Sequence, residues 1–169
     1  LEMMNRGYTR EWYMNRIESI RKIIPDCAIS MDIITGFCSE TEKEHNDTLS
    51  LMEYVKYDFG YMFAYSERPK TLAERKYKDD VPAEVKSRRL AEIVELQLKH
   101  SAERTKEGLG KVHRVLVEGV SKKSKEQLFG RNSQSLVVVF PKENYKPGDY
   151  VNVLAEECTG ATLIGKVVK

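Results

Sequence analysis

Apolar positions in the first part of the chain recur with two different periods. After Thr9, a residue type that favours helix N-caps, apolar side chains follow every three or four residues and predict an amphipathic helix. The run CAISMDII (27–34) is typical of a strand buried on both faces of a parallel sheet. Ser39 and Thr41, each with Glu three residues later, offer overlapping capping boxes for a second helix. An aromatic residue at every second position from Phe59 predicts a second strand, which completes a rhythm typical of α/β architecture.

The pattern changes twice in the remaining residues. Asp79 or Asp80, followed by Pro82, opens a long polar helix that we expect to run to about residue 107. From Lys111 the chain consists of short β-rich runs separated by turn residues, which indicates a small barrel or sandwich. The expected fold class is therefore α/β plus β. The expected parts are an α/β unit, a bridging helix and a β-domain, at residues 1–75, 76–110 and 111–169.

Composition narrows the class of protein. The chain has 169 residues, of which 41% are hydrophobic and 32% charged, as in ordinary globular proteins. No apolar run approaches the roughly 18 residues that span a bilayer, so we expect no membrane contact. The three cysteines, Cys27, Cys38 and Cys158, form neither a disulfide framework nor a metal-binding pattern, which favours a reducing cytoplasm. Because the chain begins without Met, inside what looks like structured sequence, we expect a fragment of a longer protein.

Charge is distributed unevenly along the chain. The net charge is +2, but residues 111–169 hold ten Lys and Arg against six Asp and Glu. A basic module at this end favours a polyanionic partner. On charge alone, a solvated face explains the same excess equally well.

Candidate ligand contacts follow the two strands predicted for the α/β unit, because ligands of such units lie beyond the carboxyl ends of the strands. Gly36 would allow a tight turn or a close backbone approach there, and Tyr65, Ser66 and Arg68 supply donors and one cation. Ordinary turn, cap and surface-charge roles remain open for all of them. Asp32 lies inside an apolar strand, so we expect it to be buried and either salt-bridged or functional.

A second candidate site lies between two β-rich runs of the C-terminal module. Lysines cluster there, followed by an aromatic residue and a Gly-Arg-Asn corner. Cations track phosphates, an exposed aromatic ring can stack on an unpaired base, and Arg or Asn can contact a base edge. A solvated hairpin with its Phe tucked into the barrel explains the composition equally well. The candidate RNA-binding residues are Lys122, Lys123, Lys125, Phe129, Arg131 and Asn132.

Several ordered motifs together resemble one protein family. They are MNRGYT (4–9), IPDCAISMDIITGFCSETE (24–42), FAYSERPKT (63–71), LVEGVSKKSKEQLFGR (116–131), VVF (138–140) and GDYVNV (148–153). With their spacing, they resemble the C-terminal part of the radical S-adenosylmethionine (SAM) methylthiotransferases. One departure is the loop at residues 36–41, where GFCSET replaces the family's usual GFPGET.

The resemblance implies a fold and a cofactor site. Residues 1 to about 75 would be the last part of a radical-SAM partial (β/α) barrel. Residues from about 111 would form a TRAM domain, a small OB-like β-barrel that binds tRNA. In the family, the positions of Ile34 and Gly36 lie near bound SAM, and YSERP ends a strand around the same cavity. The residues we therefore expect at the cofactor and substrate cavity are Asp32, Ile34, Gly36, Tyr65, Ser66 and Arg68.

The resemblance also implies an activity and partners. The parent enzyme would methylthiolate C2 of an N6-isopentenyladenosine next to the anticodon of tRNA, with SAM and two [4Fe-4S] clusters as cofactors. The family's three-Cys cluster motif does not occur in residues 1–169, so we expect this chain to be inactive alone and to hold no catalytic residue or metal ligand. We expect tRNA as the partner of a monomer. Two alternatives are a methylthiotransferase acting on a ribosomal-protein aspartate, which the Lys-rich loop disfavours, and a non-enzymatic RNA-binding protein.

Overall fold

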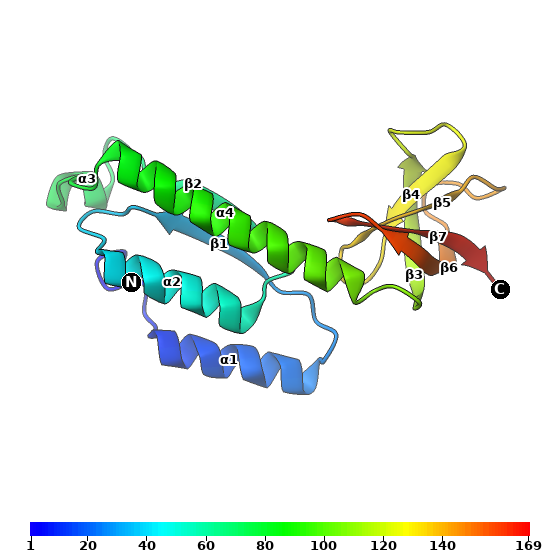
Figure 1. The fold of residues 1–169 in the computed structure, drawn as a ribbon, viewed down its shortest axis with the longest axis horizontal. Helices are drawn as coiled ribbons and strands as arrows, with labels where there is room; N and C mark the ends of the chain where they lie inside the picture. Colours follow the sequence, from blue (N-terminus) through cyan, green and yellow to red (C-terminus); the bar gives the residue numbers. More distant parts are fainter. The chain divides into compact units, whose positions relative to one another are not determined.

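The chain forms two compact units, which the computed structural model describes over residues 1–169 (Figure 1). They comprise residues 1–98 and 99–169. The first four turns of α4 (Ala83–Lys106) thus belong to the first unit, where Ile93 is fully buried, whereas the sequence set a bridging helix apart at 76–110. No helix of the chain combines the length and the apolar character that crossing a membrane requires.

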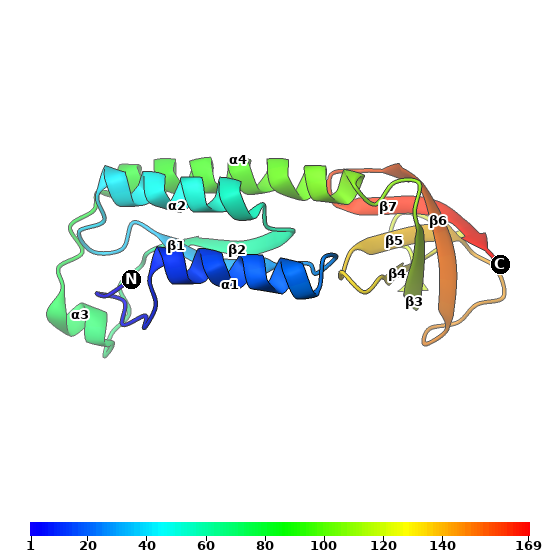
Figure 2. The same ribbon diagram turned by 90° about the horizontal axis from the view of Figure 1, so that it is seen from below.

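The first unit builds a two-stranded parallel sheet covered by helices. Besides the start of α4, its elements are α1 (Arg10–Ile23), β1 (Ser30–Thr35), α2 (Glu42–Val55), β2 (Phe59–Ala64) and α3 (Leu72–Lys76). Helix α2 and the first turns of α4 lie over one face of the sheet (Figures 1 and 2). Its core consists of apolar side chains from α1, β1, α2 and α4 together with one tyrosine: Ile17, Met31, Met52, Val55, Tyr57 and Ile93.

Local capping signals fix where two of these helices begin. The Thr9 hydroxyl accepts a hydrogen bond from Trp12 N, as the sequence predicts for the start of α1. Of the two overlapping capping boxes expected for α2, only the one from Thr41 to Glu44 forms. Ser39 lies before the helix with a φ of 62° and is therefore not its cap. It donates from its backbone N and its hydroxyl to the two carboxylate oxygens of Asp80, at 2.6 and 2.9 Å.

The sheet is covered on one face only, so the expectation of a strand buried on both faces is wrong within this chain. Met31 and Thr35 of β1 point toward the helices and are buried, whereas Asp32 and Ile34 alternate with them and are exposed. Burial of Asp32 was likewise a wrong expectation, because the period of two places this carboxylate on the open face.

The second unit contains a closed five-stranded barrel with the topology of an OB-fold. Its strands close in the order β3-β4-β5-β7-β6, with β5 and β7 parallel and all other pairs antiparallel. The barrel interior is filled by alternate residues of the strands, with Phe140 and Leu163 the largest fully buried side chains. The strands are β3 (Val112–Val120), β4 (Gln127–Arg131), β5 (Val137–Pro141), β6 (Tyr150–Cys158) and β7 (Thr162–Val168). The sequence prediction of a small β-barrel in this part is confirmed.

Candidate cofactor-binding and nucleic-acid-binding sites

The loops that follow β1 and β2 meet at the same edge of the sheet, because parallel strands carry their carboxyl ends to one side. The backbone N of Tyr65 donates to Thr35 O at 2.8 Å, which joins the two strand ends. The rings of Phe37 and Tyr65 pack edge to face, with their centroids 4.9 Å apart. The structure therefore brings Gly36 and Tyr65 together, as expected for two segments around one cavity.

The open face of the sheet carries large apolar side chains in a continuous patch. Asp32 lies opposite Tyr61 in the parallel register, and Ile34 lies opposite Phe63. Tyr61 is 64% exposed and Phe63 58%, which is unusual for aromatic side chains in the middle of a strand. This face, with one carboxylate among apolar groups, ends at the loops that hold Gly36 and Tyr65.

Tyr65 itself is turned away from this open face. Its ring lies 5.2 Å from Nζ of Lys86, which belongs to α4 on the covered side of the sheet. Its hydroxyl is buried beside the Cys38 thiol, and burial raises the pKa of Tyr65 to about 12. Tyr65 therefore stays protonated, and its ring packs between the loop after β1 and Lys86 on the covered side of the sheet. Ser66 and Arg68, which follow it, are exposed on the loop after β2.

Two buried cations of α4 hold the same loops, and sequence reasoning missed both. Lys86 donates from Nζ to the carboxylate of Asp79 at 2.5 and 2.7 Å and to Tyr65 O at 3.3 Å. Arg89 is 4% exposed and lies one helical turn further along. Polar helix residues are usually solvated, so nothing in the local pattern of α4 distinguishes these two from their exposed neighbours.

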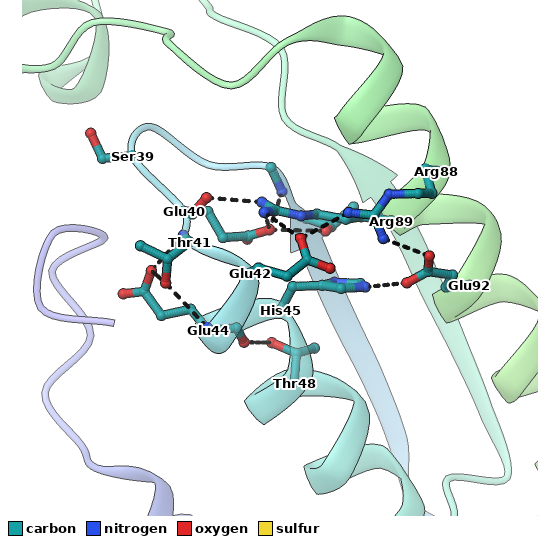
Figure 3. Close-up of polar contacts among 12 residues, drawn as sticks. Ser39, Glu40, Thr41, Glu42, Glu44, His45, Thr48, Arg88, Arg89 and Glu92 are labelled. Carbon is teal, nitrogen blue, oxygen red and sulfur yellow. Dashed lines mark hydrogen bonds and ion pairs between the residues drawn. The ribbon is translucent and has the colours of Figure 1, made fainter.

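Arg89 reaches the loop after β1 through Glu40 (Figure 3). Its NH1 donates to the Glu40 carbonyl oxygen and to Oε1 of the same residue, both at 2.9 Å. The same Oε1 accepts hydrogen bonds from Gly36 N at 2.9 Å and from the Thr35 hydroxyl at 3.2 Å. One carboxylate oxygen thus fixes the backbone at the end of β1 to a guanidinium of α4.

The contacts of Arg89 continue into a longer charged network between α2 and α4 (Figure 3). Glu42 binds both Arg88 and Arg89, at 2.8 and 3.0 Å, and these two hydrogen bonds hold the pKa of Glu42 below its usual range. Arg88 also pairs with Glu92 at 2.7 Å. Glu92 in turn lies 2.6 Å from Nε2 of the buried His45, and this hydrogen bond lowers the pKa of Glu92.

The residues predicted to bind RNA do not form one cluster in the barrel. Lys122, Lys123 and Lys125 are exposed in the connection between β3 and β4, at one end of the barrel. Arg131 and Asn132 lie at the opposite end of β4, because that strand separates them from the lysines.

The remaining predicted RNA contacts differ in how free their side chains are. Phe129 is half-buried on the outside of the barrel, opposite Gly119 of β3. Arg131 donates from NH1 to both carboxylate oxygens of Glu118, at 3.0 and 2.9 Å. Asn132 is 8% exposed, and its Oδ1 accepts from Gln134 N and Leu136 N at 3.0 Å each. Asn132 is thus engaged inside the β4–β5 turn rather than presented to a ligand.

Comparisons with known proteins give the class of the barrel unit and the relatives of the whole chain. Residues 106–168 match the family model of the TRAM domain, which is the barrel unit described above. Along 99% of its length the chain is 62% identical to the tRNA-2-methylthio-N(6)-dimethylallyladenosine synthase of Flavobacterium johnsoniae. The proteins of that name from Christiangramia forsetii and Bacteroides fragilis are 58% and 52% identical over the same share. The chain spans 35 to 37% of the length of these curated relatives.

The chain therefore carries a TRAM domain of the OB-like barrel type, and along 99% of its length it is similar to proteins of the methylthiotransferase family that its motifs indicated. Within that family its relatives are the tRNA-2-methylthio-N(6)-dimethylallyladenosine synthases, whose name designates an RNA substrate. These names favour tRNA modification over the two alternatives that the sequence left open.

The two kinds of cofactor implied by this family fit the present residues to different degrees. SAM combines an aromatic adenine ring, whose faces can pack on apolar groups, with hydroxyl, amino and carboxylate groups, and the open face offers apolar surface beside Asp32. No group of three or more His, Cys, Asp or Glu residues is placed to hold a metal ion. Cys27 precedes β1, Cys38 follows it, and Cys158 ends β6 in the other unit, so this chain supplies no ligand set for an iron–sulfur cluster.

Proposed function

We propose that this chain is part of a tRNA-modifying radical-SAM enzyme that methylthiolates C2 of N6-isopentenyladenosine next to the anticodon. The observation that carries the proposal is the joint presence of a TRAM barrel and high identity, along 99% of the chain, to synthases named for that product. In this proposal residues 1–98 are the last part of a radical-SAM partial (β/α) barrel. The TRAM unit binds tRNA.

The tRNA-binding surface of the barrel is a basic rim, formed by exposed lysines of the β3–β4 and β5–β6 connections. Both connections lie at the same end of the barrel because β3, β4 and β5 run antiparallel in succession. The backbone N of Lys142 donates to Glu126 O at 2.8 Å and joins the two loops. An OB-fold commonly binds nucleic acid with the loop between its first two strands, which is the β3–β4 connection here. The rim consists of Lys122, Lys123, Lys125, Lys142 and Lys146.

The first unit would supply part of the wall around SAM. When bound, SAM supplies the radical that starts the reaction and the methyl group of the product. The apolar face at Ile34 would contact its adenine ring and shield it from water. Asp32, exposed on the same face, would accept hydrogen bonds from its hydroxyl or amino groups. Gly36 has a φ of 72° at the end of β1, so its left-handed turn would set the path of the loop that faces the ligand.

Binding of tRNA to the full-length protein at several salt concentrations tests the RNA part of the proposal. Replacing Lys122, Lys123 and Lys125 by Ala together should reduce the slope of log K against log salt by about 2 to 3, because three phosphate contacts no longer release counterions. Exchanging Lys111, Lys166 and Lys169 for Ala removes the same charge outside the rim and is the matched control. An unchanged slope in the rim variant, or an equal change in both, would remove the assignment of the rim.

A further inference from the structure

Arg89 and Glu40 form a buried ion pair. We expect it to contribute little to the free energy of unfolding but to fix the conformation of the loop after β1. The side chains of Arg89 and Glu40 are 4% and 15% exposed, and the Arg89 Nε has no hydrogen-bond partner. Apolar residues of similar volume often stabilise a protein as well as a buried ion pair does, because desolvation offsets the charge attraction. Stability alone therefore does not account for a guanidinium at this position.

The pair acts on the backbone at the end of β1. Gly36 has a φ of 72°, in the left-handed region, and its N–H is held by Glu40 Oε1. The Thr35 hydroxyl donates to the same oxygen, and Arg89 holds that oxygen in place from the covered side of the sheet. The direction in which the β1 loop leaves the sheet is thus set by a residue of α4.

We infer that Arg89 is a positioning residue for the cofactor: through Glu40 it fixes the left-handed turn at Gly36 and so the shape of the SAM cavity. The inference rests on the proposed function, since it takes the loop after β1 to contact SAM. Arg89 lies on the covered side of the sheet, behind that loop, and would not touch the ligand. Its replacement should therefore weaken SAM binding without changing the affinity for tRNA.

The chain offers a closely matched control for Arg89. Arg88 precedes it on the same helix and shares the partner Glu42, but it is 46% exposed and makes no hydrogen bond to Glu40. Arg88→Met removes the same charge and leaves the turn at Gly36 untouched. Arg89→Met removes the charge and also the two hydrogen bonds that Arg89 donates to Glu40.

The test is the equilibrium dissociation constant for SAM in the full-length protein, measured together with the tRNA dissociation constant and the unfolding midpoint. Arg89→Met should weaken SAM binding about tenfold or more, because small misplacements of binding groups have large effects, and Arg88→Met should not. Hydrogen exchange of the Gly36 amide should speed up only in the Arg89 variant. If Arg89→Met does not fold, Arg89→Lys keeps the charge and loses the planar fork, and it should show the same pattern to a smaller degree.

A double variant separates positioning from stability. Glu40→Leu with Arg89→Met leaves no buried charge unpaired, so the unfolding midpoint should recover relative to Arg89→Met alone. Positioning predicts that SAM binding stays weak, because Gly36 N has lost its acceptor. A SAM affinity that recovers with stability, or one that never changed in Arg89→Met, overturns the inference. Absence of SAM binding in the unsubstituted full-length protein would instead overturn the proposed function, and the inference with it.

Discussion

Gly36→Ala is the substitution for which the structure predicts the largest local effect in the first unit. Gly36 has a φ of 72°, and a Cβ built on it would lie 2.5 Å from Cγ of Lys86. Lys86 cannot easily yield, because its stem is buried and its Nζ is paired with Asp79. A left-handed conformation costs an L-residue about 1 to 2 kcal/mol. Overpacking adds about 1 to 3 kcal/mol, so we expect a loss of about 2 to 5 kcal/mol in the free energy of unfolding.

A second glycine isolates the clash from the backbone strain. Gly110 also has a φ of 72°, but no atom lies within 4 Å of the position that a Cβ would take there. Gly110→Ala should therefore cost only the left-handed penalty of about 1 to 2 kcal/mol. In the double variant Gly36→Ala with Lys86→Ala, the 2.5 Å contact with Cγ is removed and most of the overpacking part should be relieved, which gives a coupling energy of about 1 to 3 kcal/mol.

Urea unfolding measures these differences with probes specific to each unit. Trp12 is the only tryptophan and lies on α1, so its fluorescence follows the first unit. For a slope near 2 kcal/mol per molar urea, Gly36→Ala should lower the midpoint by about 1 to 2.5 M. Amide hydrogen exchange of the barrel strands follows the second unit for Gly110→Ala. Equal losses in the two glycine variants, or no coupling to Lys86, would show that Lys86 does not pack on Gly36 as described.

Three further predictions concern single side chains. Asn132→Ala should lower barrel stability by about 1 to 3 kcal/mol in thermal unfolding, since two part-buried backbone N–H groups lose their acceptor. An unchanged melting temperature would contradict this. Arg131→Ala should change stability by no more than about 1 kcal/mol because its ion pair with Glu118 is exposed, and a larger loss would mean that the pair is structural. Hydrogen bonds from the Thr41 backbone N and hydroxyl hold the pKa of Glu44 below its usual 4.5, so the stabilisation is present above pH 4.5 and lost as pH falls below it. In the Glu44→Gln variant, the free energy of unfolding should fall less steeply between about pH 5 and 3 than in the unsubstituted protein. If the two pH profiles run parallel, the titration of Glu44 does not cause the loss of stability.

The helices and strands could be predicted because their signals are local. The Thr41 capping box spans four residues, and the aromatic alternation from Phe59 lies within one strand. The buried polar side of α4 could not be predicted in the same way. Arg89 looks like any solvated helix residue until the fold places it against Glu40, 49 positions earlier in the chain. Burial of a charge is a property of the tertiary contact, and the sequence near Arg89 does not encode it.

The candidate RNA-binding residues show how neighbours in sequence can lie far apart in space. Lys122 to Asn132 read as one polar segment, but Gln127–Arg131 forms a strand that carries its two ends to opposite ends of the barrel. The residues that approach the lysines in space come instead from the β5–β6 connection, through the bond between Lys142 N and Glu126 O. Barrel topology, rather than composition, decides which lysines lie together.

The two candidate sites differ in how firmly their loops are held, and the difference matches the ligands proposed for them. The loop after β1 is fixed at Gly36, Ser39 and Glu40 by hydrogen bonds that include side chains of α4 and of the segment before it. The β3–β4 lysine loop is held by backbone bonds, such as Lys123 N to the Ser121 hydroxyl at 3.3 Å and Lys142 N to Glu126 O at 2.8 Å, and no hydrogen bond to another unit of secondary structure fixes its lysine side chains. A small cofactor gains affinity from a preorganised wall, whereas phosphate binding depends mainly on charge and tolerates adjustable side chains. Substitutions behind the first loop should therefore change affinity at every salt concentration alike, and substitutions in the lysine loop should change mainly its dependence on salt.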